Sequence, residues 1–215
     1  QAANGAQNNF MVLADRLEIQ SGDAGDVFVW DAQGWYGGDI NKLSIKTEGE
    51  FSLDQSAFED ANIQALWSRA IAPFWDVQAG IRYDLEPKGR TYAALGVQGL
   101  APYWFEVDAT AFLSTDGDLS ARIEAEYELR FTQRLVFQPR TEIEFSAQDI
   151  PELSIGSGLT RLSIGARLRY EIKREFAPYV GVEWQGSFGQ TQNYIQAMGG
   201  DTDKTLIIFG LRTWF

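Results

Sequence analysis

Residues 204–215 read Lys204-Thr-Leu-Ile-Ile-Phe-Gly-Leu-Arg-Thr-Trp-Phe215. In an extended chain, successive side chains point to opposite faces. One face of this segment therefore carries Ile207, Phe209, Leu211, Thr213 and Phe215. The opposite face carries Lys204, Gly210 and Arg212. This two-residue period predicts a β-strand with one apolar face and one polar face.

The same alternation recurs along the chain from near residue 10. It is strongest in the segments 41–51, 74–86, 104–114, 119–131, 135–145, 162–171 and 179–188. It is weaker, because fewer charges mark the polar face, in the segments 10–20, 26–37, 60–72 and 91–100. Together these segments predict about twelve strands, each near or above the roughly 9–11 residues that a tilted membrane strand needs.

A chain that ends on such a strand with a free Phe resembles the C-terminal signature of bacterial outer-membrane barrels. The predicted connections alternate between short turns and longer, acid-rich and glycine-rich loops, as in those barrels. Aromatic residues gather near the predicted strand ends, as interfacial girdles require, among them Trp35, Tyr36, Phe74, Tyr103 and Trp104. The prediction is an all-β fold, an antiparallel transmembrane β-barrel of about twelve strands spanning residues 10–215. Both termini are expected on the periplasmic side, and residues 1–9 are expected to form a flexible polar tail.

A soluble β-sandwich is the alternative, with the apolar face as a core and the charged face in water. Sandwich strands alternate less regularly, with turns about every 8–12 residues. Small apolar residues such as Ala109, Ala111, Ala121 and Ala125 suit a lipid face, where no interlocking core has to be filled. The regularity shared by all strands therefore favours the membrane barrel, located in the bacterial outer membrane.

The composition excludes several classes of function. The net charge of -12 opposes binding to nucleic acid, whose phosphates require a basic surface. The chain has no Cys, which excludes disulfides and thiolate chemistry, and no His, which removes the usual general base and the commonest metal ligand. Because barrel hydrolases use His beside Ser or Asp, we expect no enzymatic activity.

In a barrel, the polar faces line the lumen. Isolated charges in a narrow lumen are costly, so most of them are expected to pair. A cation path, or metal site, is predicted on the most acidic strands, at Glu106, Asp108, Glu124, Glu126, Glu142 and Glu144. A surrounding charge network is predicted at Lys46, Glu48, Glu50, Asp76, Arg82, Arg122, Glu128, Arg140, Arg167, Arg169 and Arg212. Structural pairing alone is the competing interpretation of these carboxylates.

A second acidic set falls in the predicted long loops. Its members are Asp23, Asp26, Asp54, Glu59, Asp60, Asp116, Asp118, Asp149, Glu152, Asp201 and Asp203. At the outer mouth these residues would raise the local concentration of cations, or bind the divalent ions that bridge lipopolysaccharide.

Several longer motifs carry a family resemblance. They are Trp30-Asp-Ala-Gln-Gly-Trp-Tyr-Gly-Gly-Asp39, Asn41-Lys-Leu-Ser-Ile-Lys-Thr-Glu-Gly-Glu50, Gln78-Ala-Gly-Ile-Arg-Tyr-Asp84, Gly96-Val-Gln-Gly-Leu-Ala-Pro-Tyr-Trp-Phe-Glu-Val-Asp108 and Phe176-Ala-Pro-Tyr-Val-Gly181. With them, the chain from about residue 10 to Phe215 resembles the copper resistance protein B family. The resemblance implies an outer-membrane protein of Gram-negative bacteria that acts in copper tolerance and is encoded with periplasmic copper-handling proteins.

The resemblance also implies the ligand and the partners. Copper ion would be transported or weakly bound, with no organic cofactor, and the partners would be outer-membrane lipid, lipopolysaccharide and a periplasmic copper-binding protein. Family members often carry a Met- and His-rich N-terminal segment, whereas this chain has only Met11 and Met198. Copper prefers imidazole, thioether or thiolate, so the carboxylates that remain would form a weak and unselective site.

Three hypotheses follow from the sequence. The first is a barrel of copper homeostasis that passes copper, or helps to export or sequester it, at a narrow charged lumen. The second is a barrel closed by salt bridges that serves as a structural or docking platform for a periplasmic copper carrier. The third is an unselective small cation pore.

Overall fold

A computed structural model describes residues 8–23 and 25–215 as one antiparallel sheet. Its first seven strands are β1 (Asn9–Gly22), β2 (Gly25–Gly37), β3 (Asn41–Ser52), β4 (Ala57–Ala72), β5 (Trp75–Glu86), β6 (Arg90–Ala101) and β7 (Phe105–Ser114). The remaining strands are β8 (Leu119–Tyr127), β9 (Leu129–Arg130), β10 (Leu135–Ser146), β11 (Gly158–Tyr170), β12 (Phe176–Ser187) and β13 (Asp203–Trp214). All four of the weaker predicted strands are present. Of the predicted N-terminal tail, residues 1–7 lie outside the described residues.

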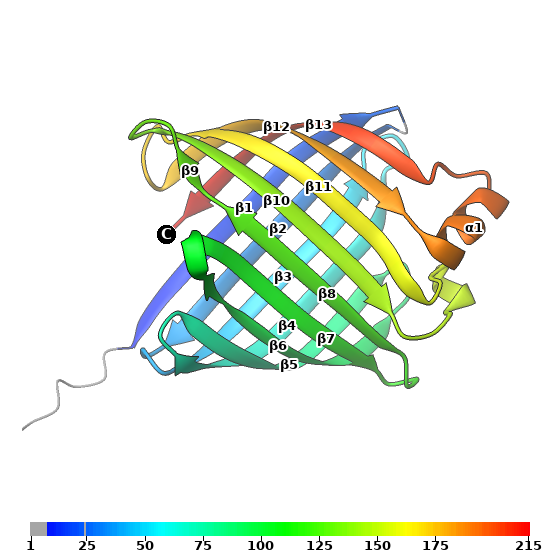
Figure 1. The fold of residues 1–215 in the computed structure, drawn as a ribbon, viewed down its shortest axis with the longest axis horizontal. Coiled ribbons are helices and arrows are strands. Elements are labelled where there is room, and N and C mark those ends of the chain that lie inside the picture. Colours follow the sequence, from blue (N-terminus) through cyan, green and yellow to red (C-terminus); the bar gives the residue numbers. More distant parts are fainter. Residues whose placement is uncertain (1–7, 24) are drawn as a thin grey trace, which may run out of the picture.

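The sheet closes on itself because β1 pairs with both β2 and β13. At the junction the chain ends bind each other: Val12 N donates to the Phe215 carbonyl at 3.0 Å, and Phe215 N donates to the Val12 carbonyl at 2.8 Å. β8 and β9 both pair with β10 in one register and act as a single interrupted strand. The result is a closed barrel of twelve strands, which confirms the predicted fold (Figure 1).

Pro139 accounts for the interruption between β8 and β9. Its position in β10 lies opposite Tyr127, between the paired residues Arg140–Glu126 and Phe137–Leu129. Proline has no N–H to donate, so a ladder that reaches it loses a hydrogen bond. Glu128 lies at the break, and its side-chain carboxylate accepts hydrogen bonds from Arg169 and Arg212.

The two ends of the barrel differ. The start of β1 and the C-terminus lie at one end of the barrel, the terminal end, where the connections are short: 38–40, 73–74, 102–104, 131–134 and 171–175. The opposite end, the loop end, carries the two longest connections, with the short helix η2 (Pro151–Leu153) and the helix α1 (Gly189–Ala197) (Figure 1). The predicted asymmetry in length holds for the connections 147–157 and 188–202 only, because the other four at the loop end are as short as those at the terminal end. The helix α1 lies in a segment predicted to be a loop. Among the described residues, no helix is long and apolar enough to cross a membrane.

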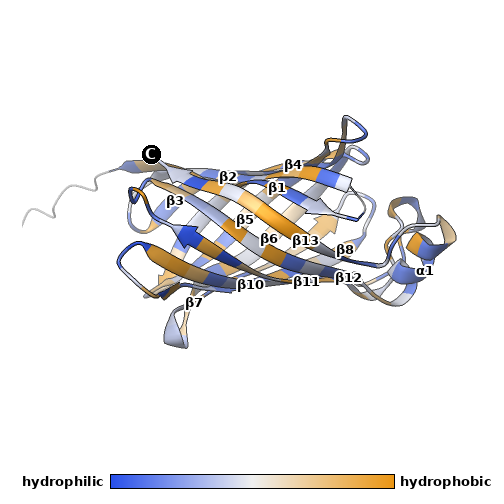
Figure 2. Ribbon diagram, turned by 90° about the horizontal axis from the view of Figure 1, so that it is seen from above, coloured by the Kyte–Doolittle hydropathy of each residue, from blue (hydrophilic) through white to orange (hydrophobic). Residues whose placement is uncertain are grey.

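Hydrophilic and hydrophobic residues alternate along the strands, as the sequence predicts (Figure 2). On the outside, Ile207 and Phe209 of β13 are each 57% exposed. On the inside, Arg169 of β11 is only 2% exposed. The apolar face therefore covers the outer surface, and the charged face lines the lumen. Trp35, predicted as a girdle residue, instead points inward, with the Lys42 Nζ atom 5.3 Å from its ring centroid.

A β-bulge in β1 turns two consecutive charged residues into the lumen. The register with β2 shifts between Ala14 and Arg16, so Asp15 is the extra residue. Both side chains find inward partners: Asp15 pairs with Arg212 at 2.6 Å, and Arg16 with Asp31 at 3.3 Å. A bulge shifts the alternation of a strand by one residue, so a strict two-residue period does not continue through residues 10–20.

The connections at the loop end fold over the barrel mouth. Gly156 N donates to Thr191 Oγ1 of α1 at 2.8 Å. A Cβ atom at Gly156 would lie 2.5 Å from Gln190 Cβ and from Thr191 N, so only glycine allows this approach. Lys88 forms an ion pair with Glu152 and lowers the pKa of this exposed carboxyl below its usual value. These contacts hold three connections together at one side of the mouth.

The lipid-facing role of the outer surface gives a first prediction. Ile164, halfway along β11, is 52% exposed on the outside. Replacing it with Arg is expected to cost about 2–4 kcal/mol of stability, the range found for basic residues at the bilayer midplane. Urea unfolding of the barrel in lipid vesicles measures this cost. Gln33→Arg, in the largest luminal cavity, is the control; an equal loss for both variants would contradict the assignment of faces.

Candidate functional site

The lumen contains three cavities in series. The largest, about 710 Å³, lies at the terminal end and is called the terminal vestibule; its wall includes Asp15, Lys46, Phe74, Glu106, Asp108 and Glu126. A small cavity of about 60 Å³ follows, bounded by Arg16, Glu48, Arg122, Arg140, Glu142 and Glu183. The loop-end chamber, about 380 Å³, is bounded by Arg82, Tyr92, Phe112, Ile150, Ile155 and Ile195 among others. The smallest of these three cavities is therefore the one whose wall is richest in charged side chains.

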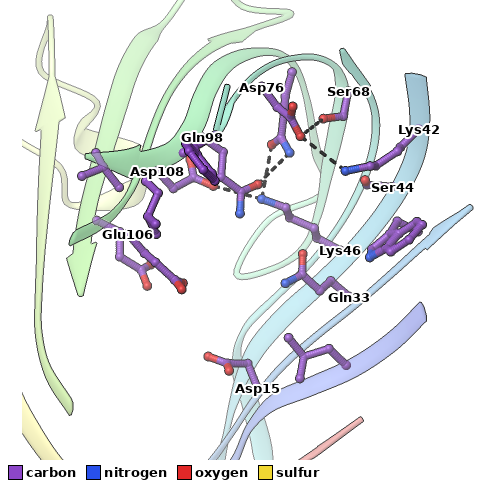
Figure 3. A pocket seen from close by; sticks show the side chains of 18 of the residues that line it. Asp15, Gln33, Lys42, Ser44, Lys46, Ser68, Asp76, Gln98, Glu106 and Asp108 are labelled. Carbon is purple, nitrogen blue, oxygen red and sulfur yellow. Dashed lines mark hydrogen bonds and ion pairs between the residues drawn. The ribbon is translucent and has the colours of Figure 1, made fainter. Parts of the chain in front are cut away.

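Acidic side chains dominate the terminal vestibule (Figure 3). Nine carboxylates line it: Asp15, Asp31, Asp39, Glu48, Asp76, Glu106, Asp108, Glu124 and Glu126. Three basic side chains oppose them: Lys42, Lys46 and Arg212. A concave surface with one predominant sign of charge focuses its field and raises the local concentration of counter-ions. The vestibule is thus suited to cations.

Six of these nine carboxylates are neutralised by ion pairs. Asp31, Glu48 and Glu124 pair with arginines that border the neighbouring cavity, and Asp15 pairs with Arg212. Lys46 Nζ lies 3.0 Å from Asp108 Oδ2, and Lys42 Nζ lies 3.7 Å from Asp76 Oδ2. Glu106 and Glu126 lie directly opposite each other on β7 and β8, and neither forms an ion pair with any of the residues described. Like charges in this arrangement destabilise a sheet, so a cation between them would be favourable.

Arg122 joins opposite walls of the barrel. From β8 its Nη1 donates to Glu48 Oε2 on β3 at 2.6 Å, across the lumen. The same guanidinium lies 3.4 Å from Glu144 and 3.7 Å from Glu142 on the neighbouring β10. Three carboxylates thus hold one arginine in the path between the vestibule and the loop-end chamber.

Arg140 forms a second bridge beside the first. Its Nε and Nη2 donate to the two oxygens of Glu124 at 2.8 and 2.7 Å, and Nη2 also donates to Glu142 at 2.6 Å. A bidentate arginine–carboxylate pair is the strongest form of this contact. Glu142 therefore connects Arg140 with Arg122, and the two bridges form one network.

The most buried pairs lie along the wall made by β11, β12 and β1. Arg167 donates to Glu18 at 3.1 and 2.8 Å and to Glu183 at 3.0 Å, and Tyr179 donates to Glu18 at 2.9 Å. The Glu18 side chain has no exposed surface. Nearby, Arg169 donates to Glu128 and, at 2.9 Å, to Gln138. These contacts fix one side of the lumen.

The six carboxylates predicted as a cation path do not form one cluster. Glu106, Asp108, Glu124 and Glu126 border the terminal vestibule, whereas Glu142 and Glu144 border the small central cavity. Four of the six are in ion pairs, and Glu106 and Glu126 are not. Within the described part of the chain, no three acidic, His or Cys side chains lie close enough together to hold a metal ion. The cation path remains a prediction, now centred on Glu106 and Glu126.

The predicted outer-mouth acids lie at the loop end, where several have structural partners. Arg90 pairs with Asp118 at 2.7 Å and with Asp116 at 2.9 Å. Asp54 accepts from Asp26 N at 2.9 Å, and Asp149 accepts from Ser157 N at 2.7 Å. Part of this acidic set therefore stabilises the loops themselves.

Asp15, Arg16 and Asp31 belong to the site but were not predicted. Asp15 and Arg16 lie at the bulge, where strict alternation assigns consecutive residues to opposite faces. Two adjacent charges inside an otherwise alternating segment were the signal that could have revealed them. Glu18 and Glu183 were also missed as network members, although both occupy polar positions of their strands.

Comparison with known proteins agrees with the motifs. The family model for the copper resistance protein B precursor (CopB) matches residues 8–215. A copper resistance protein B homolog of Pseudomonas syringae pv. tomato is 43% identical over 216 residues, which cover 100% of this chain and 72% of that protein. Copper resistance protein B of Escherichia coli is 42% identical over 208 residues, which cover 96% of this chain and 70% of that protein.

Solved structures resemble the barrel in fold alone. The NanC porin aligns with a TM-score of 0.58 at 11% identity, covering 95% of this chain and 99% of its own. The KdgM porin aligns with a TM-score of 0.56 at 10% identity, with the same coverage of both chains. Outer membrane phospholipase A from Escherichia coli gives 0.53 at 11% identity, covering 99% of this chain and 93% of its own.

The family match over almost the whole chain and the closed barrel of outer-membrane type lead to the same conclusion. The outer surface of such a barrel contacts the lipid and lipopolysaccharide of the bacterial outer membrane. The chain belongs to the copper resistance protein B family and is an outer-membrane β-barrel.

Proposed function

We propose that this barrel acts in copper resistance by accepting copper ions in the terminal vestibule and passing them through the lumen. The observation that carries the proposal is the acidic wall of the vestibule of about 710 Å³, where Glu106 and Glu126 face each other and neither forms an ion pair with a described residue. Its terminal end is expected to face the periplasm, where a copper-binding protein would deliver the ion.

The carboxylates act on copper by attraction more than by coordination. Hard oxygen ligands hold copper less tightly than imidazole or sulfur, so the ion would stay exchangeable. Weak, multiple contacts are what conduction requires, because an ion must be able to leave each site. Selectivity for copper would then come from the partner that delivers it.

A closed docking barrel is the second candidate, favoured by the bridge between Arg122 and Glu48. That bridge crosses the lumen beside a central cavity of only about 60 Å³. In this version the vestibule binds copper ions or docks a periplasmic copper carrier, and no ion passes through the lumen. An ion that crosses the lumen must pass the Arg122 guanidinium, so the two candidates differ in whether this side chain leaves a path open.

Catalysis is not part of the proposal. Phospholipase A shares the fold, but fold does not determine function. Hydrolases of the Ser-His-Asp type need a His as general base, and the chain contains none.

Neutralising the unpaired carboxylates tests the role of the vestibule. The double variant Glu106→Gln/Glu126→Gln is expected to lower the cation-to-anion permeability ratio severalfold, because it removes two facing charges that no ion pair compensates. Reversal potentials in planar bilayers under a salt gradient measure this ratio. Asp108→Asn is the matched control: its carboxylate already pairs with Lys46, so a smaller effect is expected. An unchanged ratio in the folded double variant would refute the role of this pair.

A further inference from the structure

The loop-end chamber differs from the rest of the lumen in its apolar walls. Tyr92 and Phe112, on β6 and β7, pack edge to face with ring centroids 6.5 Å apart and form a buried cluster with Leu66 and Ala94. The chamber is closed from the other side by aliphatic side chains, Ile150, Leu153 and Ile155 of the β10–β11 connection and Ile195 of α1. Passage of a hydrated metal ion gives no reason for such walls.

Polar groups enter this chamber from one side. Glu50 and Asp60 line it and lie directly opposite each other on β3 and β4. Neither forms an ion pair with a described residue; the same is true of one basic lining residue, Arg161. The other basic lining residues are engaged: Arg82 with Asp84 at 2.5 Å, Lys88 with Glu152, and Arg122 with Glu144 and the central network. The uncompensated charge in the chamber is therefore negative.

The aromatic pair already holds a cation. The Arg82 guanidinium carbon lies 5.0 Å from the Phe112 ring centroid and 5.7 Å from that of Tyr92. An aromatic face within about 6 Å of a cation attracts it by about 0.5–2 kcal/mol, more as water is excluded. A site with aromatic faces, aliphatic walls and unpaired carboxylates has the chemistry that recognises alkylated ammonium groups.

From these three observations we propose that the loop-end chamber binds a small organic cation with an apolar body. The volume of about 380 Å³ falls in the roughly 300–1,000 Å³ range of small-molecule sites. Glu50 and Asp60 hold the ammonium group, and Tyr92, Phe112 and the isoleucines of the folded loops contact the apolar body. This site is separate from the terminal vestibule and does not depend on copper passage.

Calorimetric titration of the folded barrel in detergent micelles, with blank micelles subtracted, tests the proposal. The probe is phenyltrimethylammonium, compared with tetramethylammonium, which has the charge without the body, and benzyl alcohol, which has the body without the charge. Phenyltrimethylammonium is expected to bind roughly tenfold more tightly than either. No binding, or equal binding of benzyl alcohol, would overturn the proposal.

Two variants locate the site. Glu50→Gln/Asp60→Asn removes the charge, and Phe112→Leu removes an aromatic face; each is expected to weaken binding of the probe severalfold. Asp76→Asn, in the terminal vestibule, is the control and should leave it unchanged. If only Asp76→Asn weakens binding, the probe occupies the vestibule and the chamber assignment is wrong. Heat modifiability on gels verifies that each variant is folded.

Discussion

Replacing Arg122 with Gln is expected to raise the single-channel conductance for cations about tenfold, which corresponds to roughly 1.4 kcal/mol off the barrier. Arg122 holds a positive charge at the smallest of the three cavities, between the two larger ones. At an effective dielectric constant of about 20, a cation roughly 6 Å from a guanidinium is repelled by about 3 kcal/mol. Three nearby carboxylates reduce this repulsion, so only part of it is expected to appear in the conductance.

Glu48→Gln is the matched control for Arg122→Gln. It removes the cross-lumen contact but leaves Arg122 held by Glu142 and Glu144 on β10. The guanidinium then stays in the path, and a much smaller rise is expected. Both variants are recorded in planar bilayers from protein whose folding has been verified. A folded Arg122→Gln barrel with wild-type conductance would show that this bridge does not limit passage.

Replacing Arg167 with Met is expected to destabilise the barrel by about 3–5 kcal/mol, the cost of leaving buried charges unpaired. The side chains of its partners, Glu18 and Glu183, are 0% and 3% exposed, so neither can recover its hydration where it stands. Tyr179 and Gln20 still donate to Glu18, which limits the loss. Urea unfolding followed by tryptophan fluorescence measures it.

The variant Arg167→Lys separates the effect of the positive charge from the effect of the hydrogen-bond geometry. Lysine keeps the positive charge but cannot donate in the forked pattern that joins Arg167 to both oxygens of Glu18. An intermediate loss of stability is expected. If Arg167→Met were as stable as wild type, Glu18 and Glu183 would be better hydrated than their burial indicates. The interpretation of this side of the lumen as a rigid wall would then be wrong.

The sequence predicted the barrel well because alternation is a local property. Each of Ile164, Phe209 and Arg169 lies on the face that its place in the two-residue period assigns. Exceptions arise where the backbone departs from regular pairing. The bulge at Asp15 places consecutive charges on one face, and Pro139 divides one strand into β8 and β9.

The partners of the luminal charges could not be predicted in the same way. The alternation predicts that Glu48 and Arg122 point inward. It does not give their height along the barrel axis or the side of the lumen from which each one points. These two residues meet across the barrel although 74 positions separate them, because the tilt and stagger of all intervening strands bring them together. For the same reason, the sequence alone could not distinguish Asp108, which has a lysine partner, from Glu106, which has none.

The aliphatic walls of the loop-end chamber could not be predicted from the sequence either. Ile150, Ile155 and Ile195 lie in connections whose polar and glycine-rich composition predicted exposed loops. Their inward orientation depends on tertiary contacts such as Gly156 with Thr191, which no local pattern encodes.

Copper flux into proteoliposomes holding the refolded barrel tests the central claim most directly. Entry is followed with a copper-sensitive dye and compared with the entry of sodium, potassium and zinc. The proposed function predicts copper entry that exceeds that of empty liposomes and falls in Glu106→Gln/Glu126→Gln. Copper entry no faster than in empty liposomes, from protein shown to be folded, would contradict passage and favour a closed barrel that works by docking.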